Sequence, residues 1–65
     1  MTDDEVEALL VEIDVEAERC RSDPSRYGSL GVLLDRARKA GVDTGTLRGR
    51  SGLDAEEVER LIAEA

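Results

Sequence analysis

The stretch that decides the fold is residues 41–58, GVDTGTLRGRSGLDAEEV, because it holds the end of one helix and the start of the next. Gly41 followed by Val42 is typical of a helix that stops in the left-handed conformation and makes a hydrophobic contact behind the stop. Asp54 and Glu57 have the spacing of a capping box, which opens a helix. The stretch therefore predicts two helices joined by a connector.

The connector itself, residues 41–53, contains three glycines after Gly41. Each glycine inside a helix costs about 1 kcal/mol relative to alanine, so a long helix is disfavoured here. We expect an irregular, extended connection with at most one short turn, capped by Asp43 and anchored by Leu47.

The last helix is expected over 55–64, where apolar residues fall on one face. The helix before the connector is expected to end at residue 40 and to begin at 24 or 29. Pro24 suits the first helical position after Asp23, whereas Gly28 and Gly31 weaken a helix. These two glycines either allow the first helix to approach closely or mark a loop up to residue 29.

The first helix is expected over 3–21, with Thr2 and Glu5 as its capping box and Met1 packed on Val6 as a hydrophobic staple. A narrow apolar stripe follows steps of three and four residues, and acidic residues occupy the rest of the surface. Two readings of this stripe stay open: it packs on the rest of the chain, or it pairs with a second copy or another protein. The stripe, which we call the seam, consists of Val6, Leu10, Ile13, Ala17 and Cys20.

These elements predict one all-α domain of three helices over residues 1–65. An acidic amphipathic helix, 1–22, precedes a helix–extended loop–helix unit, 23–65. Tyr27, the only aromatic residue, is expected to close the core, and Cys20 to be a small buried apolar residue. The other predicted core residues are Val6, Leu10, Ile13, Leu30, Leu34, Val42, Leu47, Leu53, Val58, Leu61 and Ile62.

Composition excludes several functional classes. The 65 residues include no histidine and a single cysteine, so neither a zinc site nor an intramolecular disulfide is expected. No nucleophile has a base at a recognisable spacing, so we expect no enzyme activity, no catalytic residue and no cofactor. No apolar run approaches the ~20 residues of a membrane span, and the acidic start is unlike a signal peptide. We therefore expect a cytoplasmic protein that does not bind membranes.

Charge is uneven along the chain. Residues 1–29 carry nine carboxylates against three arginines, a net charge of −6, and residues 30–65 carry seven carboxylates against six bases, a net charge of −1. Such an acidic front repels phosphate backbones and favours basic protein surfaces. A solvated helix face that serves only solubility is the plainer interpretation.

Residues 33–62 resemble the peripheral subunit-binding domains of acyltransferase subunits, which are small helix–extended loop–helix units. The matching segments are ARKAGVD at 37–43, LRG at 47–49 and DAEEV at 54–58. The loop is about three residues shorter than in that family. Leu34 and Asp35 stand where the family carries basic docking residues, so its partner specificity does not carry over.

The same region is similar to the C-terminal domain of actinobacterial nucleoid-associated silencers, whose loop presents Arg-Gly-Arg to DNA. Here the counterpart is Arg48-Gly49-Arg50. The resemblance implies insertion of the two arginines into the minor groove. A third comparison, the helix-turn-helix with Gly52 as its turn glycine, places a row of glutamates against phosphates, which is unfavourable.

The sequence thus favours a small, acidic, non-enzymatic and regulatory protein–protein interaction module whose partner it does not name. The alternative is a DNA-binding module that uses the Arg-Gly-Arg loop. A homodimer or an obligate partner contact through the first helix is also predicted, with Val6, Leu10, Ile13 and Ala17 at the contact and an antiparallel arrangement expected for the homodimer. The candidate partner-binding residues are Arg38, Lys39, Arg48, Gly49 and Arg50.

Overall fold

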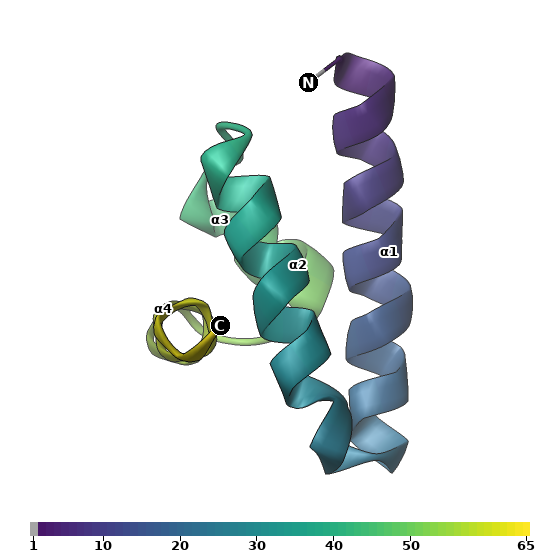
Figure 1. The fold of residues 1–65 in the computed structure, drawn as a ribbon, viewed down its shortest axis with the longest axis vertical. Coiled ribbons are helices and arrows are strands. Elements are labelled where there is room, and N and C mark those ends of the chain that lie inside the picture. The colour runs from purple at the N-terminus through teal and green to yellow at the C-terminus, as the bar shows by residue number, and fades with distance from the viewer. Residues whose placement is uncertain (1) are drawn as a thin grey trace.

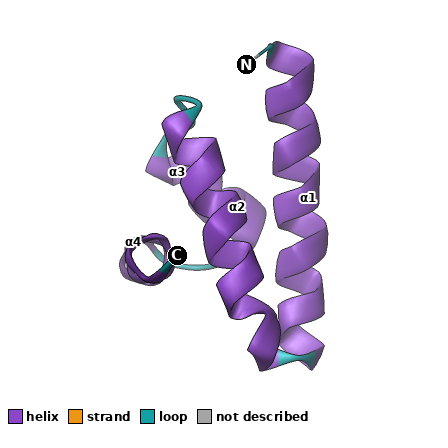
Figure 2. Ribbon diagram, in the orientation of Figure 1, coloured by secondary structure: helices purple, strands orange, loops and turns teal. Residues whose placement is uncertain are grey.

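The computed structural model describes residues 2–65, and every regular element in that part is helical. The all-α class is confirmed, and no strand occurs between residues 2 and 65 (Figure 2). Four α-helices are present where three were expected. The elements are α1 (Asp3–Ser22), the single-turn 3₁₀ helix η1 (Pro24–Arg26), α2 (Tyr27–Lys39), α3 (Thr44–Ser51) and α4 (Ala55–Glu64).

The first helix, α1, begins as the capping signal predicts. The Thr2 hydroxyl oxygen accepts a hydrogen bond from the Glu5 amide at 3.3 Å, while the staple partner Met1 lies outside the described residues. The predicted seam faces inward, and Leu9 and Glu16 widen the buried face. Cys20 is buried, as expected.

The start of α2 falls between the two predicted positions. Asp23 caps η1 by accepting a hydrogen bond from the Ser25 amide at 3.2 Å, and Pro24 occupies the first position. The α-helix then begins at Tyr27, so the predicted loop up to residue 29 is wrong. Gly31 does permit close packing, but the neighbour is Leu61 of α4 and not α1.

The end of α2 is the predicted left-handed stop. Gly41 has φ +98°, the Gly41 amide donates to the Arg38 carbonyl, and the Val42 amide donates to the Ala37 carbonyl. These are the two hydrogen bonds of a Schellman motif, which satisfy carbonyls left open at the helix end.

The expected irregular connector is wrong, because residues 44–51 form the two-turn helix α3. Asp43 caps it, with the Thr46 amide donating to Asp43 Oδ1 at 2.7 Å. Gly52, with φ +73°, lies after the helix as its left-handed cap, so only two of the three glycines lie inside. Burial of Leu47, which is 0% exposed, offsets the cost of those two. The unit is therefore helix–helix–helix, without an extended loop.

Figure 1 shows how the helices are arranged. The helices α1 and α2 lie side by side and are joined through η1, α4 contacts the opposite side of α2, and α3 packs behind α2 against α1. The helix α4 has the predicted bounds, and its cap is Asp54, which accepts from the Glu57 amide at 2.8 Å.

One core is shared by all four α-helices. Cys20 and seven of the other predicted core residues are buried, whereas Val6, Val42, Leu53 and Ile62, together with Tyr27, pack against the core while partly exposed. The buried apolar residues are Leu9, Leu10, Ile13, Ala17, Cys20, Leu30, Leu34, Ala37, Leu47, Val58 and Leu61.

Candidate functional site

The Arg-Gly-Arg motif lies at the end of α3 and not in a loop, which corrects the geometry that the sequence implied. Arg50 is bound to α1, because its guanidinium donates hydrogen bonds to Asp14 Oδ2 and to Glu7 Oε1, each at 3.2 Å. These two carboxylates raise the pKa of Arg50. Arg48 and Gly49 are exposed. The two arginines therefore do not reach out together as a minor-groove clamp requires.

The basic residues at the end of α2 also bind within the chain. Arg38 forms a two-pronged ion pair with Glu59 of α4 and donates to the Thr44 hydroxyl at 2.5 Å. The hydrogen bonds between Arg38 and Glu59 lower the pKa of Glu59 and raise the pKa of Arg38. Lys39 pairs with Asp35 one turn earlier, at 2.9 Å. Arg38 thus joins α2, α3 and α4.

The residues predicted for self-association pack within the core of the single chain. Leu10, Ile13 and Ala17 are buried in the core of a single chain, and Val6 packs against that core. The helices α2 and α3, together with η1, cover the face that was expected to exceed what the rest of the chain could bury. A contact with a second copy through the seam would require α1 to leave its own core.

The opposite face of α1 carries exposed apolar side chains that were not among the residues predicted from the sequence. Val11 is 48% exposed and Val15 is 45% exposed, one turn apart on the same helix. With half-buried Leu33 of α2 and the flanking residues Glu12, Glu16 and Arg19, they line a shallow hollow of about 310 Å³. The three apolar side chains line one hollow, so they are not scattered singly over the surface.

This hollow is one of three that share residues along α1. A second includes Val15, Glu18 and Arg19, and a third continues past Arg19 to the end of the helix. Together they form a surface that we call the α1 outer face, defined as Val11, Glu12, Asp14, Val15, Glu16, Glu18, Arg19, Ser22, Asp23, Arg26 and Leu33.

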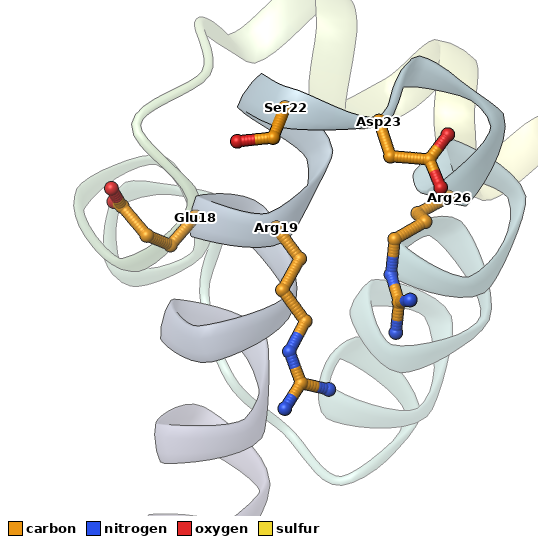
Figure 3. A pocket seen from close by; sticks show the side chains of 5 residues that line it. All are labelled: Glu18, Arg19, Ser22, Asp23 and Arg26. Atoms are coloured by element: carbon orange, nitrogen blue, oxygen red, sulfur yellow. The ribbon is translucent and has the colours of Figure 1, made fainter.

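The charged end of the α1 outer face is shown in Figure 3. The Arg19 and Arg26 side chains extend in the same direction, and Glu18 points to the other side of the helix. This hollow has a volume of about 460 Å³ and includes the hydroxyl of Ser22 and the carboxylate of Asp23. Both signs of charge are therefore available to a bound group.

A partly buried ion pair holds this end in place. Glu16 is only 8% exposed, and its carboxylate accepts from Arg26 Nε at 2.8 Å and from Arg26 Nη2 at 3.3 Å. The hydrogen bond from Arg26 lowers the pKa of Glu16 despite burial. Because the contact is two-pronged, it fixes η1 against α1 and so sets the position of the arginine.

Cys20 is the single cysteine of the chain and is 1% exposed. Burial raises the pKa of the Cys20 thiol, which disfavours the nucleophilic thiolate. Within residues 2–65, no three potential metal ligands come together and no helix is long and apolar enough to cross a membrane.

One sequence signal could have found the α1 outer face: Val11 and Val15 are spaced by four residues outside the seam. The signal is short and lies among acidic residues, so the larger stripe obscured it. Comparisons of the chain with protein-family models, with characterised proteins and with solved structures found no match.

Proposed function

We propose that the chain is a small, non-enzymatic, regulatory module that binds another protein through the α1 outer face. The observation that carries the proposal is the exposure of Val11 and Val15 beside Leu33. Apolar patches rimmed by polar groups are typical of protein-binding surfaces. Desolvating these side chains on binding is favourable, and the surrounding charges select the partner.

The basic residues first considered as contacts have a different part in this proposal. Arg38, Lys39 and Arg50 form ion pairs within the chain. Only Arg48 and Gly49 of the Arg-Gly-Arg motif remain exposed for a partner. DNA binding by this motif therefore has less support than protein binding, and it becomes an outcome of the test.

The test is site-specific photo-crosslinking in cells of the organism that encodes the chain. A photoreactive residue replaces Glu12 on the α1 outer face, Val32 on the exposed side of α2, or Gly49 on α3; all three positions are exposed. We expect one protein adduct at position 12, identified by mass spectrometry, and none at position 32. Adducts with nucleic acid at position 49, or no adduct at position 12, would contradict the proposal.

A further inference from the structure

The chemistry of the α1 outer face indicates what kind of partner it takes. Resting on the proposed function, we infer that the occupant is a basic amphipathic helix of another protein, laid along α1. Three observations support this choice: the length of the surface, the position of its apolar end, and its charge.

The surface is elongated, as a helix requires. Its residues on α1 run from Val11 to Ser22, which spans about 17 Å at 1.5 Å per residue. A partner helix of about three turns covers this length. Because the hollows share Val15, Glu18 and Arg19, the surface is continuous along that path.

The apolar end provides the anchor points. Val11 and Val15 lie one turn apart, and Leu33 closes the hollow from α2. A helix that lays its apolar face in a groove presents anchors at i, i+3, i+4 and i+7. Two apolar residues one turn apart on a partner helix therefore match the two valines.

Charge selects a basic partner. The α1 outer face contains five carboxylates and two guanidiniums, a net charge of −3. Three of the carboxylates are already paired within the chain: Glu16 with Arg26, Glu18 with Arg21 and Asp14 with Arg50. Glu12 borders the apolar end and forms no ion pair with any of residues 2–65. Lysine or arginine beside the partner's apolar anchors would meet Glu12.

The same charge argues against two other occupants. A second copy brings a total charge of −7 and an identical acidic face, so like charges would oppose each other across the contact. A nucleic acid brings a phosphate backbone that the carboxylates repel.

The experiment uses the full chain with isotope-labelled methyl groups and follows its NMR spectrum during titration with three 18-residue peptides. The first places leucines one turn apart between lysines and arginines on a helix. The second has the same composition with the leucines scattered around the helix. The third replaces the basic residues by glutamate.

We expect the first peptide to shift the methyl signals of Val11, Val15 and Leu33 in a saturable way, and to bind more weakly as salt is added. Val15→Asp places a charge in the contact and should weaken binding at least about tenfold. Val32→Asp makes the same change at a residue of similar exposure outside the surface and should leave affinity within about twofold.

Several results would overturn the inference. Equal binding of the scrambled or acidic peptide would show that apolar register or basic charge does not matter. Shifts at the two valines on concentrating the chain alone would identify a second copy as the occupant. If photo-crosslinking at position 12 captures a protein but no basic peptide binds, the proposed function stands and this inference fails. If crosslinking captures no protein and no basic peptide binds, the proposed function and this inference are both wrong.

Discussion

A β-carbon built on Gly31 would lie 2.6 Å from the carbonyl oxygen of Leu61, so α2 and α4 pack with one backbone against the other. No side chain can give way at this point, because the neighbouring atom belongs to the main chain. The contact brings α4 against α2 and thereby helps to bury Val58 and Leu61. Gly31 is thus a packing residue, although by local propensity it only weakens the helix.

We therefore expect Gly31→Ala to destabilise the protein even though alanine is the better helix former. Gly28→Ala is the matched control, because a β-carbon there meets nothing within 4 Å. That control should raise stability by up to about 1 kcal/mol. Urea denaturation measures both, and a stabilising Gly31→Ala would mean that α2 and α4 are not in this contact.

Substitution of Leu47 measures how much the packing of α3 contributes to the stability of the fold. It is fully buried on a helix that contains two glycines, so its burial is the main reason for α3 to form. We expect Leu47→Ala to lower the free energy of unfolding by about 2–5 kcal/mol. Leu33→Ala, at a half-buried position, should cost less. Similar small losses for the two variants would argue that α3 is not docked.

Local signals in the sequence predicted much of the fold. The bounds of α4, the cap of α1 and the left-handed stop at Gly41 all depend on residues within a few positions of one another. The helix α3 was missed because it depends on tertiary burial of Leu47. Counting glycines also failed, since Gly52 lies outside the helix as its cap.

Less of the candidate site was accessible from sequence. Arg50 was predicted as a partner-binding residue, and its contacts within the chain are with residues 36 and 43 positions away, which no local pattern reveals. The exposure of Val11 and Val15 follows only once the other face of α1 is known to be buried. A helix with two apolar stripes leaves that choice to the tertiary structure.

The contact of Arg50 with Glu7 and Asp14 predicts a salt-dependent stability. Arg50→Gln removes both ion pairs between α3 and α1, so the melting temperature should fall at low salt. The difference from the unmodified chain should shrink at about 1 M NaCl, where screening is strong. Arg36→Gln removes the same charge from an exposed residue without an ion pair in residues 2–65, and should change stability by no more than about 0.5 kcal/mol. A loss that salt does not reduce would contradict an electrostatic role.

The contact of Glu16 with Arg26 predicts an acid-dependent stability. The pKa of Glu16 is lower in the folded chain than in the unfolded chain, so the folded state binds fewer protons there. The stabilisation that this ion pair provides is present above the pKa of Glu16 in the unfolded chain, about 4.3. It is lost as the pH falls through the pKa of Glu16 in the folded chain. Without histidine, we expect a flat profile between about pH 5.5 and 7.

The variant Glu16→Gln isolates this effect. It should be less stable than the unmodified chain at pH 6 and should lose less stability on acidification to pH 3. Glu12→Gln on the same helix removes a carboxylate without an ion pair in residues 2–65 and serves as the control. Parallel stability curves for Glu16→Gln and the unmodified chain would show that the ion pair does not contribute.

The most direct test of the central claim is the affinity of Val15→Asp and of Val32→Asp for the protein captured at position 12. The two valines have similar exposure, but only Val15 lies on the α1 outer face. Circular dichroism checks that both variants keep their helices, and isothermal titration measures binding. We predict at least about a tenfold loss of affinity for Val15→Asp and less than about a twofold change for Val32→Asp. Equal affinities of the two variants would contradict binding through this face.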